Sequence, residues 1–401
     1  MDRREFIVNT GVLTCGASFG MGDLLARERC RVNDDSALSE HRIDKVEYIS
    51  PAYHYPRLVG RNSRKGMHGQ HHKVRCVKLF TDQGAIGWGS AKAQLKDDEL
   101  QRTVIGKTVN ELIIPEEGIR DDVHSSLDPA LHDLAGIILN KPVYEMLGAH
   151  GPKATDIYSG MIYFDELDAK GKPTSLDKVM KNCQWDYDYG YRQLKVKIGR
   201  SGKWYPHDEG LATDIKIVKM IHDEYAGKGV DILVDANDSY SLQDTIAFLA
   251  GVKDVPIYWV EEPFREDLEK SRALKKWMMA NGRENTYYCD GEARPDLDLV
   301  EKMIINGTLD MHLTDIVSYG FTKWRKLIPF LIKHNAVASP HAWGNMLKTH
   351  YISHLAAGLG NVVTIEGVTC LSDDIDFGDF KIADGKLHVS SKPGFGMKLL
   401  I

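Results

Sequence analysis

The stretch Leu194-Lys195-Val196-Lys197-Ile198-Gly199 decides how this chain can be interpreted. Side chains along a β-strand point alternately to opposite faces, so Lys195 and Lys197 share one face while the apolar residues share the other. The apolar face predicts a strand that packs on a core. The sequence therefore places two ammonium groups in one small volume.

Seven more short apolar runs accompany this strand, and helical stretches separate them. The eight runs span residues 156–159, 194–198, 231–235, 257–261, 286–289, 311–315, 336–339 and 362–366. Regular β/α alternation predicts parallel strands joined by right-handed crossovers. The expected fold class is α/β, a TIM-like barrel of seven or eight β/α units over residues 154–370. Polar residues at the run ends, expected at one shared mouth, are Asp235, Glu261, Glu292, Asp315, His341 and Glu366.

Residues 43–153 have a different pattern, which predicts an α+β capping domain over the barrel. Two alternating strands, 73–80 and 84–89, are joined by a short turn. Residues 128–136 have helical apolar spacing, with Asp128 as the expected N-cap and Pro129 at the first position. The C-terminal segment, residues 371–401, is expected to return to this domain.

Composition limits the classes of function. The chain has 401 residues, 43% apolar, which is enough for a large core in two domains. A net charge of -6 without a basic block argues against nucleic acid as a partner. The six cysteines are scattered without a C-x-x-C pair, which indicates core thiols rather than a zinc cage or a disulfide framework. No 18-residue apolar segment predicts a membrane span.

The N-terminus resembles an export leader. Arg3-Arg4 precedes a modest apolar run, as in a twin-arginine signal, so residues 1–35 are expected to direct the protein to the periplasm. The alternatives are a disordered tail on a cytoplasmic protein or, less favoured because Thr14 precedes it, lipidation at Cys15.

Three successive strands supply carboxylates at their ends. Asp235, Glu261 and Glu292 would converge without a histidine or thiol, which favours a hard, oxygen-loving ion such as Mg²⁺, with Mn²⁺ as a substitute. Each carboxylate alone would more simply be a turn, a helix cap or a solvated strand end; the ordered set favours a metal site. Glu262 and Asp290, beside these ligands, are expected to support them.

The ordered set of motifs resembles the enolase superfamily, mandelate racemase subgroup, from Ile43 to Glu366. The motifs are Lys195-Val196-Lys197, Asp235-Ala236-Asn237, Val260-Glu261-Glu262-Pro263, Gly291-Glu292, Asp315 and Pro340-His341. One departure is that the family commonly has Gly-Gly after the strand-six aspartate, where this chain has Val317-Ser318-Tyr319-Gly320. The resemblance implies Mg²⁺-dependent abstraction of a proton α to a carboxylate, and assembly into homo-oligomers.

The resemblance also assigns roles that can be argued physically. Removing the α proton creates a second negative charge, which Mg²⁺ and a charged hydrogen bond from Lys195 can stabilise. Lys197 is the expected base, because Lys195 and the metal disfavour its protonated form. Asp315 would orient His341 as the second acid/base group. Glu366 resembles the family's hydrogen-bond donor to the substrate carboxylate.

Cations and hydrogen-bond donors in the capping domain suit an anionic carbohydrate. The predicted substrate-binding residues are Lys195, Glu366, His54, Arg57, His68 and Trp204. A solvated loop is the simpler reading of the charged residues after Tyr53, and Trp204 could stack on a sugar or merely pack.

The predicted function is dehydration of a sugar acid to a 2-keto-3-deoxy acid, a lyase reaction. A racemase or epimerase, or a cycloisomerase, would use the same groups and stays open. A sugar-acid binding protein on an inactive barrel is the alternative outside catalysis, disfavoured because the metal ligands and bases are all present.

Overall fold

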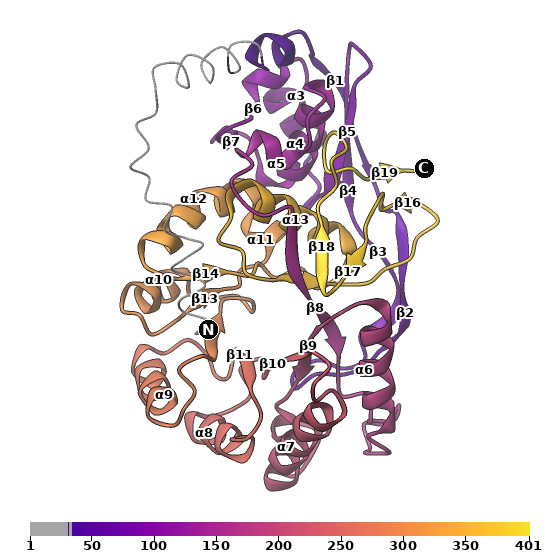
Figure 1. Cartoon of the computed structure of the whole chain (residues 1–401). Helices are drawn as coiled ribbons and strands as arrows, with labels where there is room; N and C mark the ends of the chain where they lie inside the picture. The colour runs from indigo at the N-terminus through magenta and orange to yellow at the C-terminus, as the bar shows by residue number, and fades with distance from the viewer. Residues whose placement is uncertain (1–30, 32–33) are drawn as a thin grey trace.

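The computed structural model describes residue 31 and residues 34–401, so most of the predicted leader (residues 1–35) lies outside the described residues. Its main feature is a set of parallel strands that alternate with helices (Figure 1). These strands are β8 (Ala154–Ile162), β9 (Gln193–Lys197), β10 (Asp231–Asp235), β11 (Ile257–Glu261), β12 (Tyr287–Asp290), β13 (Met311–His312), β14 (Val337–Ala338) and β15 (Ile365–Gly367).

The parallel strands close into a barrel. Each of β8 to β14 pairs with its neighbour in chain order, and β15 pairs with β8. A parallel bridge between Ala338 and Val362 joins the two ends of the ladder. The predicted α/β barrel class is thus confirmed. The helices between or after strands are α6 (Asp177–Tyr189), α7 (His207–Glu224), α8 (Leu242–Gly251), α9 (Leu268–Ala280), α10 (Leu297–Ile305), α11 (Ile316–Tyr319), α12 (Phe321–Lys333) and α13 (Met346–Leu359).

Antiparallel strands and short helices make up the N-terminal part. One sheet has the order β1-β4-β5, and β2 pairs with β3 and β6 with β7. The strands are β1 (Ile43–Ile49), β2 (Ala52–Val59), β3 (Gly69–Lys73), β4 (Cys76–Thr81), β5 (Ile86–Ser90), β6 (Ile113–Ile114) and β7 (Gly118–Ile119), with helices α3 (Asp97–Thr103), α4 (Asp128–Ile138) and α5 (Val143–Met146). Helix α4 packs so closely on β5 that a Cβ added at Gly87 would lie 2.4 Å from the Cβ of Leu134.

The start of α4 differs by one residue from the sequence prediction. Asp128 is the first helical residue and Leu127 the N-cap. The Asp128 carboxylate instead accepts hydrogen bonds of 2.8 Å from the backbone N–H and the hydroxyl of Thr322 in α12. This tertiary contact, which a local pattern does not contain, ties the capping part to the barrel.

The C-terminal segment lies against both parts of the molecule, as its yellow ribbon in Figure 1 shows. Leu371 and His54 exchange two backbone hydrogen bonds of 2.9 Å. Strand β18 (Lys386–His388) pairs antiparallel with β8 and with β17 (Ile382–Ala383), while β16 (Ile375–Asp376) pairs with β19 (Lys398–Leu399). The tail therefore contacts both β2 of the N-terminal part and β8 of the barrel.

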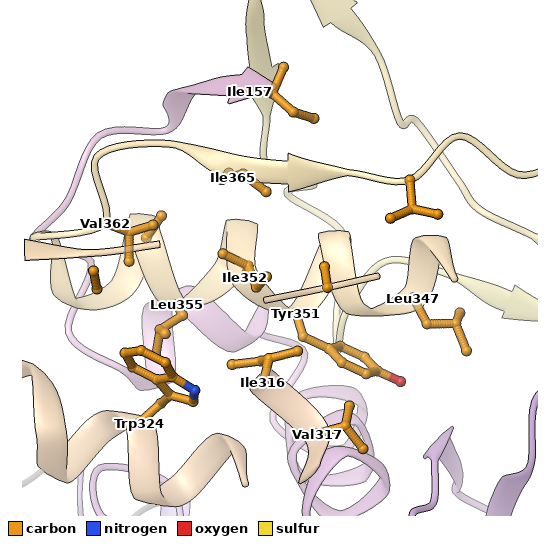
Figure 2. Packing of buried hydrophobic residues seen from close by; sticks show 14 of the residues in the cluster. Ile157, Ile316, Val317, Trp324, Leu347, Tyr351, Ile352, Leu355, Val362 and Ile365 are labelled. Atoms are coloured by element: carbon orange, nitrogen blue, oxygen red, sulfur yellow. The ribbon is translucent and has the colours of Figure 1, made fainter. Parts of the chain in front are cut away.

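Helix α13 is the most enclosed helix of the barrel. Figure 2 shows Ile352 and Leu355 of α13 between Ile365 of β15 and Trp324 of α12. Aliphatic burial of this kind contributes on the order of 1.5–3 kcal/mol per side chain. The four described cysteines (Cys76, Cys183, Cys289 and Cys370) are buried and free, as expected for core thiols. Within the described residues, no helix has the length and apolar character needed to span a membrane.

Candidate active site

Three carboxylates converge where β10, β11 and β12 end. Asp235, Glu261 and Glu292 each offer one oxygen, and these oxygens lie within 4.8 Å of one another. Asp235 and Glu261 are the last residues of their strands, and Glu292 follows β12 by two residues. Parallel strand ends share one edge, which is why residues so far apart in sequence meet.

This cluster fits a hard divalent cation. Glu261 Oε2 and Glu292 Oε2 are buried without a hydrogen-bond partner among the described residues. Burial, followed by the charge of Asp235, raises the pKa of Glu261 well above its ordinary value. Oxygen donors with unmet bonding capacity and excess negative charge are the ligands that Mg²⁺ prefers.

Lys195 and Lys197 lie beside the carboxylates, on the face of β9 that the alternation predicts. Lys195 Nζ lies 3.1 Å from Glu261 Oε1, 3.3 Å from Glu366 Oε1 and 3.5 Å from Asp235 Oδ2. Lys197 Nζ contacts Asp235 Oδ2. Both side chains are almost fully buried. The two ammonium groups therefore share one volume with the carboxylates.

The pKa of Lys197 depends on the balance between its cationic and anionic neighbours. Burial disfavours the ammonium form, and so does the charge of Lys195, as predicted, but contact with Asp235 outweighs both and raises the pKa. The pKa of Lys195 is also raised: burial opposes the charge, but Glu261 and Glu366 outweigh it. The carboxylates therefore hold both lysines in their charged forms.

His341 forms the predicted pair with Asp315. His341 Nδ1 lies 3.0 Å from Asp315 Oδ2, and its Nε2 lies 3.2 Å from Glu292 Oε1. Burial disfavours the imidazolium, but Glu292, Glu366 and Asp315 together raise the pKa of His341 to about 10. These carboxylates therefore favour the imidazolium form of His341.

Glu366 lies between the lysine and histidine sides of the site. Its Oε2 accepts hydrogen bonds of 2.6 and 2.8 Å from the backbone N–H groups of Ala342 and Trp343. Its Oε1 lies 3.3 Å from Lys195 Nζ. Burial favours protonation, but Lys195 and His341 outweigh it and lower the pKa of Glu366, so the carboxylate is ionised. It therefore accepts hydrogen bonds here, whereas the resemblance assigns it the role of a donor.

A cavity of about 660 Å³ opens from Glu292 and His341 toward solvent. Cationic residues from three segments line it: Arg64 and Lys65 of the loop before β3, Arg294 after β12, and Lys323 of α12. Arg64 pairs with Asp238, whereas no ion pair among the described residues engages the other three. Tyr319, at the departure from the Gly-Gly pattern, lines the same cavity.

Of the predicted substrate-binding residues, His54 and Arg57 lie apart from this cavity. His54 lines a separate hollow with His71 and His72, and its ring stacks on that of His71. Both terminal nitrogens of Arg57 lie 2.7 Å from the buried Asp186 carboxylate. Because its guanidinium is already paired with that carboxylate, the role of Arg57 in this structure is to neutralise a buried charge.

His68 contacts aromatic residues of the barrel, and Trp204 contacts the loop before β3. The His68 ring contacts Tyr163 and Trp343, and burial lowers its pKa to about 4, so it is neutral near pH 7. Trp204 donates a hydrogen bond of 2.8 Å to the Asn62 carbonyl, and the charged groups of Arg61 and Lys203 lie over its ring. Trp204 therefore packs against the loop that lines the cavity.

Sequence reasoning did not identify Lys348, and it assigned no role to the tyrosines of β2. Lys348 Nζ lies 2.6 Å from Asp315 Oδ2. The hydroxyls of Tyr53 and Tyr55 donate to the Gly344 carbonyl at 2.6 and 2.8 Å. Tyr53 and Tyr55 lie two residues apart on a strand, so their side chains share one face. A prediction of strand β2 from the sequence would therefore have placed them together.

A capped parallel barrel with three convergent carboxylates, two lysines and a histidine at its mouth defines the class of enolase-type barrel enzymes. The family model "Enolase C-terminal domain-like" matches residues 178–400. The chain belongs to the enolase superfamily, in the mandelate racemase/muconate lactonizing enzyme subgroup. The resemblance inferred from the sequence motifs is thus confirmed.

Curated relatives include several enzymes that act on sugar acids. Arabinonate dehydratase of Saccharolobus solfataricus is 25% identical over 83% of this chain and 90% of its own length. A 3,6-anhydro-alpha-L-galactonate cycloisomerase of Streptomyces coelicolor is 23% identical over 66% of this chain and 73% of its own length.

Among solved structures, a galacturonate dehydratase from Geobacillus sp., complexed with D-galacturonate and 5-keto-4-deoxy-D-galacturonate, is 30% identical. It has a TM-score of 0.83 and covers 90% of this chain and 95% of its own. A mandelate racemase/muconate lactonizing protein from Geobacillus sp. Y412MC10, complexed with magnesium and tartrate, is 31% identical with a TM-score of 0.83, covering 90% and 93%.

Proposed function

We propose that this enzyme dehydrates a sugar acid to a 2-keto-3-deoxy acid. The observation that carries the proposal is the placement of two proton-transfer groups around one carboxylate cluster: Lys197 contacts Asp235, and His341 contacts Glu292. A substrate whose carboxylate lies at this cluster would have its α carbon between the two groups. The sugar-acid dehydratases among the relatives support this reaction class.

The residues divide the reaction into balanced proton transfers. Lys197 in its neutral form is the proposed base, and it takes the proton from the α carbon. The β hydroxyl leaves with a proton from His341, so one molecule of water is released. The resulting enol becomes the ketone when its hydroxyl gives up a proton and the β carbon takes one up. Lys195 supplies a charged hydrogen bond to the substrate carboxylate as negative charge grows.

Asp235, Glu261 and Glu292 are the residues that would hold the metal, which we propose to be Mg²⁺. Bound there, it would supply positive charge that stabilises the developing dianion and offsets the carboxylates that keep Lys197 protonated. Relatives in complex with magnesium support this choice of ion.

A panel of sugar acids tests the reaction. Purified protein with Mg²⁺ in D₂O would be given arabinonate, galacturonate and an anhydrogalactonate, the compounds in the names of the relatives described above. Formation of keto acid, detected with semicarbazide, together with loss of water by mass supports dehydration. Keto acid of unchanged mass would replace dehydration by cycloisomerisation.

Deuterium at the α carbon without keto acid would instead identify a racemase or epimerase. This outcome is expected if Lys197 and His341 both face the α carbon, one from each side. The variants Lys197→Met and His341→Asn are the matched controls. Binding that persists fully in EDTA, with no turnover of any substrate, would favour a sugar-acid binding protein.

We also propose periplasmic export and assembly of identical chains. Export rests on Arg3 and Arg4 in the sequence. Fractionation of cells expressing the full chain and its Arg3→Lys/Arg4→Lys variant tests export, since only the unaltered chain should reach the periplasm. Sedimentation of the purified protein tests assembly.

A further inference from the structure

A second group of three carboxylates lies at the ends of the same three strands. Asp238 follows β10, Glu262 follows β11, and Asp290 is the last residue of β12. One oxygen from each lies within 4.8 Å of the others. None of these residues belongs to the first cluster, so the three strand ends carry two separate carboxylate groups.

The second cluster has unmet bonding capacity in the protein interior. Glu262 is 1% exposed and Asp290 is fully buried. Glu262 Oε2, Asp290 Oδ2 and Asp238 Oδ1 are buried without a hydrogen-bond partner among the described residues. Buried carboxylate oxygens are normally hydrogen-bonded, paired with cations or bound to metal. Two nearly inaccessible, unpartnered oxygens point to an additional ligand.

The charges around the cluster do not balance. Arg64 and Arg265 both contact Asp238, and Arg265 also lies 2.9 Å from Glu266. The cluster and Glu266 together supply four carboxylates, and Arg64 and Arg265 supply two guanidinium groups. Two negative charges remain without a partner when all four carboxylates are ionised. In particular, Glu262 and Asp290 form no ion pair with any residue in the part of the chain that the structure describes.

We propose that Asp238, Glu262 and Asp290 bind a second hard divalent cation, such as Mg²⁺ or Ca²⁺. One such ion supplies the two positive charges that the cluster lacks, and the donors are all oxygens. Oxygens on opposite sides of Mg²⁺ lie about 4 Å apart, and those across Ca²⁺ about 5 Å, so the observed spread suits an ion of this size.

The ion would act on the catalytic cluster through the backbone. Glu262 Oε1 accepts hydrogen bonds of 3.1 and 2.7 Å from the N–H groups of Glu292 and Ala293. An ion held by the other Glu262 oxygen would fix this carboxylate, and with it the segment that presents Glu292. The second ion is therefore structural, and it positions a ligand of the first.

Counting ions tests the proposal without using turnover, so the outcome is independent of the dehydratase proposal. The metal-free full-length protein would be dialysed to equilibrium against Mn²⁺, and bound Mn²⁺ per chain measured. We expect two ions for the wild type and one for Asp290→Asn. The matched variant Glu292→Gln, which removes a ligand of the first cluster, should also retain one.

Saturation of the wild type at one Mn²⁺ per chain would overturn the proposal, because protons would then neutralise the second cluster. The same conclusion follows if Asp290→Asn is folded by circular dichroism and still binds as many ions as the wild type. Should Asp290→Asn fail to fold, Asp238→Asn provides the same comparison, and its loss of one ion would support the site.

Discussion

Lys348 and His341 contact the same oxygen of Asp315. Lys348 Nζ lies 2.6 Å from Asp315 Oδ2 and His341 Nδ1 lies 3.0 Å from it. The other oxygen, Oδ1, accepts backbone hydrogen bonds from Val317 and Ser318. All of these donors hold the carboxylate in one orientation. Lys348 also donates to the Trp343 carbonyl at 3.0 Å, which links the histidine pair to the following loop.

Replacing Lys348 with Met should lower kcat more than it changes KM. Without the ammonium group, Asp315 can turn and His341 loses its fixed orientation, which costs on the order of 10–100-fold for comparable supporting hydrogen bonds. Lys348→Arg should recover much of the rate because it restores a charged donor. Steady-state kinetics of both variants measure the effect, and equal losses in the two would contradict a positioning role.

Lys197→Met and His341→Asn should each lower kcat on the true substrate by about 10²–10⁴-fold, the usual contribution of a positioned acid or base. Deuterium exchange at the α carbon separates their roles. If Lys197 is the base, exchange disappears in Lys197→Met but persists in His341→Asn. The opposite pattern would assign proton abstraction to His341.

Much of the candidate site could be predicted because strand ends are local features. Asp235 and Glu261 end apolar runs, and parallel strands bring such ends together. Lys348 could not be predicted, because a lysine in the first turn of a helix reaches Asp315 only through the path of the preceding loop. Arg57 shows the converse: sequence displays its charge but not the buried Asp186 that receives it.

Removing metal should abolish activity and lower the melting temperature. Without a cation, the buried Glu261 and Glu292 oxygens remain unpaired, and a ligand that binds only the folded state stabilises it. EDTA treatment followed by calorimetry, and then readdition of Mg²⁺, measures both effects. Glu261→Gln should show a smaller rise in melting temperature on Mg²⁺ addition than the wild type, because only the second carboxylate cluster could still bind an ion. Unimpaired turnover in excess EDTA would exclude a metal requirement.

The folded protein should lose stability as pH falls from about 6.5 toward 4. Burial lowers the pKa of His350 to about 4 from its ordinary 6.5, so the unfolded chain binds a proton that the folded chain excludes. The stabilisation that His350 contributes is complete above pH 6.5. About 2 kcal/mol of it is lost by pH 5.

His350→Phe removes that titration, and its ring would lie near Phe380. The fall in unfolding free energy between pH 8 and pH 5, measured with urea, should therefore be smaller in the variant by about 2 kcal/mol. The buried His312 and His354, whose pKa values are also lowered, to about 3, keep part of the dependence. An identical fall in both proteins would mean that His350 is protonated without unfolding.

Replacing Arg57 with Met should affect stability more than substrate binding. Asp186 is fully buried and also accepts a hydrogen bond of 2.6 Å from Ser159, so losing the guanidinium leaves an unpaired interior charge. Breaking a buried pair in this way costs about 3–5 kcal/mol. The double variant Arg57→Met/Asp186→Asn should recover part of the loss, because it removes the stranded charge. Urea unfolding of the three proteins measures the coupling. A KM raised many-fold with unchanged stability would instead place Arg57 on the substrate, as its sequence context predicts.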